Sequence, residues 1–350
     1  MKKIIGDACH DYLTKQVKQE LAFSPEKDFN EWKGQVEQKL FELLGMDKIE
    51  KNVCPLNIEI EEDVTLDGYR RIRFTFESEK ESIVPCYLLI PNTGKEKYPL
   101  AIMLQGHTSG FHVSIGVSGK DINDHLFMGS GEYPDRNYFG LQAVKNGFAA
   151  LCIEQRGFGE RVTSRHGFWE GACQFAATHA LMLGRTIIGE RVWDVSRAID
   201  AMSNFDMVDT SFVMVAGHSG GGTATFYSAC YDKRIKLAVV AGAFCTYEHS
   251  IMAVRHCVCN YIPHAYENFD MGDLTCLIAP RKLIVCGGVE DEGFPKEGVE
   301  IAINTAKQVF EKAGVPENCR FESMPCAHEW RESIIWNAIN EEVAKIKKGK

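Results

Sequence analysis

The sequence lacks long hydrophobic runs and clusters of basic residues. No apolar stretch approaches the roughly 20 residues that a membrane-spanning helix needs. The opening MKKIIGDACHDYL has a basic dipeptide, but its apolar run is too short for a secretory signal. Lys and Arg number 39 against 48 Asp and Glu, which gives a formal net charge of −9. Because phosphate binding needs a clustered basic surface, we predict neither a nucleic-acid nor a membrane partner.

Cysteines are numerous, but they lack the spacing of a disulfide framework or a zinc motif. The thirteen are scattered and odd in number, and only Cys257 and Cys259, in HCVCN, lie close together. These two and His256 could hold a metal, but no fourth ligand follows at a suitable spacing. We therefore predict packing rather than metal binding there, and no cofactor. Free thiols in this number are typical of a reducing compartment, so we expect a cytoplasmic protein.

The hydrophobic pattern changes twice along the chain and predicts an α/β fold. Residues 1–55 have helical spacing and are expected to form an N-terminal helical extension. Residues 56–90 alternate apolar and polar residues, as half-exposed antiparallel strands do. Five continuously apolar runs follow, at 99–107, 147–157, 211–219, 235–244 and 281–291. Such runs, separated by amphipathic helices, indicate a mostly parallel sheet covered by helices.

One large α/β domain over residues 56–350 accounts for this order of elements. Two long stretches, near 107–140 and 245–279, fit neither strand nor helix cleanly. Both follow the carboxyl ends of predicted strands, where open α/β sheets bind their ligands. We expect these insertions to form the walls of a pocket.

The segment GHSGG, residues 217–221, fits the pattern G-x-S-x-G. A glycine-rich turn often produces this pattern, and that is the alternative interpretation. Here the apolar run FVMVA precedes it and TATFYSACY follows, which is the strand–turn–helix context of a nucleophile elbow. We therefore predict that Ser219 is a nucleophile.

A serine hydroxyl needs a base, and the base needs an orienting acid. Four of the eleven histidines follow Ser219, and three of these lie inside the 245–279 insertion. His328 follows the last strand-like run and precedes a C-terminal helix, so we predict that it is the base. Asp291, after the run KLIVC, is the predicted acid, with the neighbouring Glu290 as the alternative. Neighbouring residues at a strand end point in opposite directions, and the sequence alone does not separate the two.

Acyl transfer also needs donors for the oxyanion of the tetrahedral intermediate. The backbone amide of Gly220 is one candidate. The second should come from the loop QGHTSG after the first apolar run, through the amide of His107 or Thr108. The His107 side chain could instead contact substrate or cap the loop. We expect structural rather than catalytic roles for Arg156, and for an Arg–carboxylate network in GERVWDV that braces its helix.

Several motifs taken together carry a family resemblance: QGH, EQRGFGER, GRTIIGERVWDV, GHSGGG, HCVCNYIP, FDMGDLTCLIAPRKLIVCGGVEDEGFP and AHEW. Over roughly residues 80–345 the chain resembles the α/β-hydrolase superfamily, and within it the bacterial acetyl xylan esterase-like and dienelactone hydrolase-like branch. The resemblance implies an eight-stranded, mostly parallel sheet, a Ser219–Asp291–His328 triad, ester hydrolysis and no metal. The chain departs from the common pattern at Gln105, where an oxyanion motif often has histidine.

These observations predict a serine hydrolase for carboxylic esters, in particular short-acyl (acetyl) esters of carbohydrates or similar small molecules. Aromatic and histidine side chains of the 245–279 region and the strand before it are the predicted pocket lining: Phe244, Tyr247, His256, Tyr261 and Phe269. The alternatives are a peptidase or acyltransferase on the same scaffold, or a non-catalytic binding protein that retains the fold. The expected partner is a small-molecule ester, and a homo-oligomer is compatible with the sequence.

Overall fold

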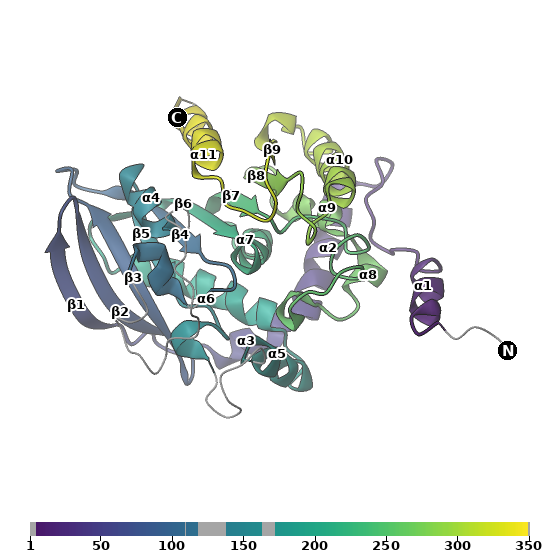
Figure 1. Cartoon of the computed structure of the whole chain (residues 1–350), viewed down its shortest axis with the longest axis horizontal. Coiled ribbons are helices and arrows are strands. Elements are labelled where there is room, and N and C mark those ends of the chain that lie inside the picture. The colour runs from purple at the N-terminus through teal and green to yellow at the C-terminus, as the bar shows by residue number, and fades with distance from the viewer. Residues whose placement is uncertain (1–4, 109, 118–137, 163–171, 349–350) are drawn as a thin grey trace.

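A nine-stranded mixed sheet runs through the molecule (Figure 1). The computed structural model describes residues 5–108, 110–117, 138–162 and 172–348. The strands are β1 (Glu59–Leu66), β2 (Tyr69–Glu79), β3 (Ser82–Pro91), β4 (Tyr98–Leu104), β5 (Ala149–Ile153), β6 (Val208–His218), β7 (Ile235–Ala241), β8 (Lys282–Gly288) and β9 (Cys319–Met324). They lie in the order β1-β2-β3-β5-β4-β6-β7-β8-β9.

The sheet confirms the predicted fold class but has nine strands instead of eight. Strands β1, β2 and β3 form an antiparallel entry, and β3 pairs antiparallel with β5. From β5 to β9 every neighbouring pair is parallel. The count exceeds eight because three antiparallel strands precede the six parallel ones, and of these three only β1 and β2 are partly exposed, whereas β3 is mostly buried.

Helices cover both faces of the sheet. The helices of the described residues are α1 (Ala8–Thr14), α2 (Phe29–Leu44), α3 (Met46–Ile49), α4 (Phe139–Lys145), α5 (Ala172–Met182), α6 (Ile187–Met202), α7 (Gly220–Tyr231), α8 (Ala265–Asn268), α9 (Met271–Leu274), α10 (Lys296–Lys312) and α11 (Glu332–Lys348). Of these, α1 has no buried residue and lies apart from the sheet (Figure 1). The core cluster on one face contains residues of α2, α6, α7 and α10, and the cluster on the other contains residues of α4 and α11. In β4, Ile102 belongs to the first cluster and Ala101 to the second, because successive strand residues point to opposite faces.

The N-terminal segment contributes to the same core as the sheet. Four apolar residues of α2 at helical spacing are buried: Trp32, Val36, Leu40 and Leu44. Asp28 caps the helix by accepting a hydrogen bond from the Glu31 amide, and Gly45, with φ 77°, ends it. The Thr186 amide, at the start of α6, donates to the Leu44 carbonyl over 3.2 Å. Packing and hydrogen bonds thus both join α2 to α6.

The two predicted insertions are described to different extents. In the first, near 107–140, residues 109 and 118–137 lie outside the described residues, and Phe111–Ile115 form a buried 3-10 turn. In the second, 245–279, short helical turns including α8 and α9 replace a long loop. Helix α9 begins with a capping box formed by Asp270 and Asp273. The second insertion is therefore a packed part of the fold.

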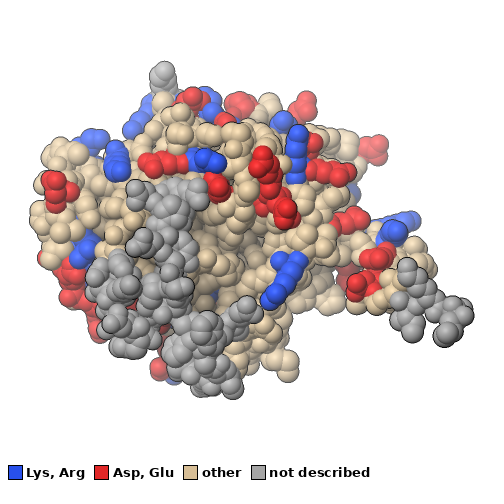
Figure 2. Space-filling view, in the orientation of Figure 1, with Lys and Arg blue, Asp and Glu red and all other residues tan. Residues whose placement is uncertain are grey.

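The surface mixes both signs of charge. On the face shown in Figure 2, acidic and basic side chains are interspersed among the residues that are drawn in colour. Within the described part of the chain, no helix is long and apolar enough to cross a membrane.

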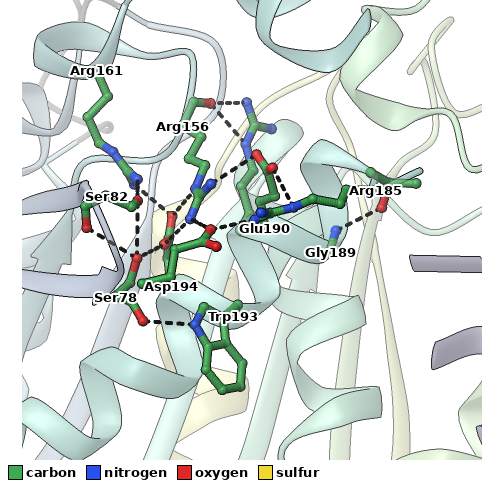
Figure 3. Close-up of polar contacts among 12 residues, drawn as sticks. Ser78, Ser82, Arg156, Arg161, Arg185, Gly189, Glu190, Trp193 and Asp194 are labelled. Atoms are coloured by element: carbon green, nitrogen blue, oxygen red, sulfur yellow. Dashed lines mark hydrogen bonds and ion pairs between the residues drawn. The ribbon is translucent and has the colours of Figure 1, made fainter. Parts of the chain in front are cut away.

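A buried ion-pair network joins β2 to α6 (Figure 3). Asp194 of α6 accepts hydrogen bonds from Arg156 at 3.1 Å, from Arg161 at 2.7 Å and from the Ser78 hydroxyl at 2.6 Å. Arg156 also pairs with Glu190 at 3.1 Å. Each buried charge here has an oppositely charged partner, which offsets the cost of its desolvation.

Glu79, at the end of β2, extends this network and brings in Arg185. It pairs with Arg156 at 2.6 Å and with Arg185, which also pairs with Glu190 at 3.0 Å. The structure thus agrees with the expected structural role of Arg156 and the bracing of α6. The neighbouring Arg191, also expected in the network, makes different contacts, described below.

The contact between α2 and α6 can be tested with a pair of glycine substitutions. A Cβ at Gly189 of α6 would lie 2.3 Å from the Leu44 carbonyl oxygen, whereas a Cβ at Gly34 of α2 would meet nothing within 4 Å. We expect Gly189→Ala to lower the free energy of unfolding by about 1–3 kcal/mol, because the backbones must separate. Gly34→Ala should raise it by about 0.5–1 kcal/mol. Urea unfolding of both variants measures the difference, and equal effects would contradict this packing.

Candidate active site

Ser219 occupies a strained turn between β6 and α7. Its φ of 55° and ψ of −125° lie in a region that side chains rarely adopt. The flanking glycines leave no room for a side chain. A Cβ at Gly217 would lie 2.3 Å from the Gly221 oxygen, and one at Gly221 would lie 2.1 Å from the Leu104 oxygen. This is the geometry of a nucleophile elbow.

Asp291 and His328 form a hydrogen-bonded pair at the ends of neighbouring strands. Asp291 follows β8 and His328 follows β9, and Asp291 Oδ2 lies 2.7 Å from His328 Nδ1. The other carboxylate oxygen, Oδ1, accepts the amides of Gly293 at 2.9 Å and Phe294 at 3.1 Å. Burial opposes ionisation of Asp291, but the bond to His328 and the two amides lower its pKa below the ordinary value. The neighbouring Glu290 is exposed, so the structure brings Asp291 to His328.

Backbone contacts place the His328 imidazole against the turn that carries Ser219. The Ser219 amide donates to the Ala241 carbonyl over 2.9 Å. A Cβ on the next residue, Gly242, would lie 3.1 Å from His328 Cε1. The ring of Phe294 stacks on His328, with centroids 5.8 Å apart. Asp291 and His328 are thus bonded to each other, and the three predicted residues Ser219, Asp291 and His328 follow the carboxyl ends of β6, β8 and β9.

The loop after β4 also lies close to Ser219. A Cβ at Gly106 would lie 3.0 Å from Ser219 Cβ, and one at Gly220 would lie 3.1 Å from His107 Nδ1. The loop backbone therefore approaches both Ser219 and Gly220, as the predicted oxyanion site requires. The His107 side chain is engaged on its Nε2 edge, which lies 3.3 Å from Cys259 Sγ. The Thr108 hydroxyl bonds to Gly110 within the loop.

Glu154, which the sequence analysis did not single out, holds this loop from behind. Its buried carboxylate accepts hydrogen bonds from Gln105 Nε2 at 3.0 Å and from the amides of Phe111 and Glu160 at 3.3 Å. Burial is the main reason that the pKa of Glu154 rises to about 8. Gln105, the departure from the family pattern, thus uses its side chain to bind Glu154. An acidic residue directly after the apolar run AALCI was the available signal.

Three of the predicted pocket residues belong to the hydrophobic core instead. Phe244, Tyr247 and Phe269 are almost fully buried in the cluster that includes α7 and α10. The Tyr247 hydroxyl bonds to that of Tyr227 at 2.7 Å. Their side chains are packed in the core rather than exposed to a pocket, and Phe244 contacts Phe226 of α7 at a ring-centroid distance of 5.3 Å.

The other two predicted pocket residues have polar or open surroundings. His256 Nε2 lies 3.0 Å from the Ser250 hydroxyl and 3.1 Å from the Gly293 carbonyl. Its ring packs edge-on against Phe294, the residue that stacks on His328. Burial lowers the pKa of His256. Tyr261 is 38% exposed. Phe294 thus lies between the rings of His256 and His328, and His256 Nε2 is bonded to Ser250 and Gly293.

The buried carboxylate of Glu154 predicts a pH dependence of stability. Because its pKa is raised from 4.5 to about 8 in the folded protein, the folded state binds more protons than the unfolded state between these values. The free energy of unfolding should therefore fall as the pH rises from about 4.5 to about 8. Glu154→Gln should remove this component. Urea unfolding of both proteins across this range measures it, with Glu290→Gln as the control for loss of an exposed carboxylate. Parallel pH profiles of wild type and Glu154→Gln would contradict the prediction.

Comparisons with known proteins agree with this architecture. The "Putative hydrolase YtaP" of Bacillus subtilis is 27% identical over 237 residues, which is 64% of this chain and 75% of that protein. A crystal structure described as a putative acetyl xylan esterase from Bacteroides fragilis superposes with a TM-score of 0.74 at 16% identity, covering 93% of this chain and 83% of the other. A glucuronoyl esterase from Solibacter usitatus gives a TM-score of 0.61 at 16% identity, covering 92% and 96%.

A family model covers most of the chain. The model of the Abhydrolase family matches residues 6–326, which include the strained serine turn, Asp291 and all of β9, and which end two residues before His328. The matched range also includes α2, in line with its packing against α6. The resemblance read from the motifs is thereby confirmed, and the chain belongs to the Abhydrolase family of α/β-hydrolases.

Proposed function

We propose that this protein is a serine hydrolase that cleaves carboxylic esters through a Ser219–His328–Asp291 triad. The observation that carries the proposal is the 2.7 Å bond between Asp291 and His328, set against the strained turn of Ser219. A serine hydroxyl is activated when a histidine base lies beside it and a buried acid orients that histidine. The relatives named above include esterases, which supports this reaction class.

The geometry supports a two-step acyl transfer. His328 Nε2 takes the proton of the Ser219 hydroxyl as its Oγ attacks the ester carbonyl carbon. Asp291 binds the Nδ1 proton of His328, which fixes the tautomer and stabilises the imidazolium. The amides of Gly220 and of His107 or Thr108 donate to the negative oxygen of the tetrahedral intermediate.

Collapse of the intermediate releases the alcohol and leaves an acyl-enzyme. The alcohol leaves with the proton that His328 holds, and the acyl group remains on Ser219 Oγ. His328 then takes a proton from water, whose oxygen attacks the acyl carbon. A second tetrahedral intermediate breaks down to the carboxylic acid and free Ser219. The cycle consumes one ester and one water and yields one acid and one alcohol.

The triad assignment predicts a large loss of activity when any of the three residues is replaced. Ser219→Ala and His328→Ala should each lower kcat/KM for p-nitrophenyl acetate by about 10⁴-fold, and Asp291→Asn by a similar factor through the wrong histidine tautomer. A fluorophosphonate probe should label the wild type at Ser219. Glu290→Gln is the matched control, because it alters the exposed neighbouring carboxylate and should leave kcat/KM close to the wild-type value. Full hydrolysis by Ser219→Ala, or a loss in Glu290→Gln with activity kept in Asp291→Asn, would overturn the assignment.

For the natural substrate we propose a short-acyl, acetyl-type ester of a carbohydrate. Relatives are named for acetyl xylan and for glucuronoyl esters, which differ in whether the sugar supplies the alcohol or the acid. A panel of acetylated xylo-oligosaccharides, the methyl ester of glucuronic acid, feruloyl esters and longer-chain p-nitrophenyl esters separates these classes. We expect kcat/KM for the acetylated sugar to exceed that for every other class by about tenfold or more, the discrimination that about 1.4 kcal/mol of pocket contacts supplies. A preference for the glucuronate ester would reassign the sugar to the acyl side.

A further inference from the structure

Three thiols and one imidazole from separate parts of the chain converge beside the oxyanion loop. His107 follows β4, Cys173 lies in the first turn of α5, and Cys257 and Cys259 belong to the insertion after β7. Their ligand atoms, His107 Nε2 and the three Sγ atoms, all lie within 4.8 Å of one another. The triad mechanism uses none of these four side-chain atoms.

The spacing of the four atoms matches a tetrahedral metal site. With metal–sulfur bonds of about 2.3 Å, the donors of a tetrahedron lie about 3.8 Å apart. His107 Nε2 lies 3.3 Å from Cys259 Sγ, close to a tetrahedral edge that includes a shorter metal–nitrogen bond. A cation at the centre would need only small movements of the side chains.

The donor set selects the kind of metal. Soft thiolates together with an imidazole favour Zn²⁺, whereas Mg²⁺ and Ca²⁺ require oxygen ligands. Because the protein supplies all four donors, a tetrahedral ion would have no open position for substrate or water. Such a closed site is structural rather than catalytic.

The buried guanidinium of Arg191 is a second observation that favours negatively charged thiolates in this cluster. Its guanidinium is buried and lies over the ring of Phe158, 4.4 Å from the centroid. Its hydrogen bonds go to the Arg156 carbonyl at 2.7 Å and to Cys173 Sγ at 3.2 Å. A buried cation is costly without a negative partner. Three thiolates around Zn²⁺ carry a net charge of −1, which Arg191 would neutralise as an outer partner of a ligand sulfur.

We propose that His107, Cys173, Cys257 and Cys259 bind one Zn²⁺ ion in a closed tetrahedral site. Binding displaces the protons of the three thiols, so that three protons are released for each ion bound by the reduced, neutral cluster. The ion cross-links the loop after β4, the start of α5 and the insertion after β7. His107 adjoins Gly106, and its ring lies against Gly220. The zinc site therefore fixes the loop whose amides are assigned to the oxyanion.

Metal content is the first test. The untagged full-length chain, produced with zinc in the medium and purified under reducing conditions without chelator, should contain about one zinc per chain by elemental analysis. Cys259→Ser should lower this to below about a tenth, since it removes one of the four donors. Cys230→Ser is the matched control. Cys230 is a buried thiol outside the cluster that donates to the Leu274 carbonyl, which a hydroxyl can also do, and the variant should keep its zinc.

A spectroscopic measurement on the wild type keeps the proposal testable if Cys259→Ser fails to fold. After the zinc is exchanged for Co²⁺, the protein should show the visible bands of tetrahedral cobalt and a near-ultraviolet thiolate charge-transfer band. A mercurial reagent should then release the ion together with three thiols that were previously protected. Neither readout depends on ester hydrolysis, so failure of the proposed enzyme activity would not be mistaken for failure of the site.

Three results would overturn the zinc site. The first is reduced wild-type protein that neither contains zinc nor binds it with micromolar affinity. The second is a disulfide between two of the three cysteines in protein isolated under reducing conditions, found by mass spectrometry. The third is undiminished zinc in a folded Cys259→Ser variant.

Discussion

The close approach between the end of β4 and the turn after β6 constrains the whole site. A Cβ at Gly221 would lie 2.1 Å from the Leu104 oxygen, so the helix that follows Ser219 can start only where this position is glycine. Within this crowded turn Ser219 has a positive φ of 55°, which is strained for a residue with a side chain. Gly106 and Gly242 then let the neighbouring loops approach from either side. Close backbone packing thus surrounds Ser219, the proposed nucleophile.

The sequence predicted the fold class and the order of the site residues because both depend on local patterns. Continuously apolar runs identify strands buried on both faces, and the residues directly after them must lie at one edge of a parallel sheet. Ser219 and Asp291 lie at the ends of such runs, and His328 follows the last strand-like run. Neither side-chain direction at a strand end nor the choice between Asp291 and Glu290 can be read in this way. That choice depends on the amides of Gly293 and Phe294, which hold the Asp291 carboxylate toward His328.

What the sequence did not predict depends on contacts between distant segments. Aromatic residues of a loop near an active site can line a pocket or cover a helix. Phe244 and Phe269 cover the core because the insertion folds back over α7. The four residues of the proposed zinc site are spread from His107 to Cys259. Their spacing therefore resembles no zinc motif, and His256, which the spacing did suggest, bonds to Ser250 and Gly293 instead.

The loop after β5 connects these separate features. Glu154 and Arg156 stand two residues apart but serve different partners. Glu154 binds the oxyanion loop through Gln105 and Phe111, while the Arg156 side chain joins the ion pairs of α6. The Arg156 carbonyl also holds Arg191 against the cysteine cluster. The contacts to the loop after β4, to α6 and to Arg191 are therefore all made by residues 154–156. In the part of the chain described, the ion-pair network contacts none of Ser219, Asp291 and His328, but Arg156 lies two residues from Glu154, which binds the loop proposed to hold the oxyanion.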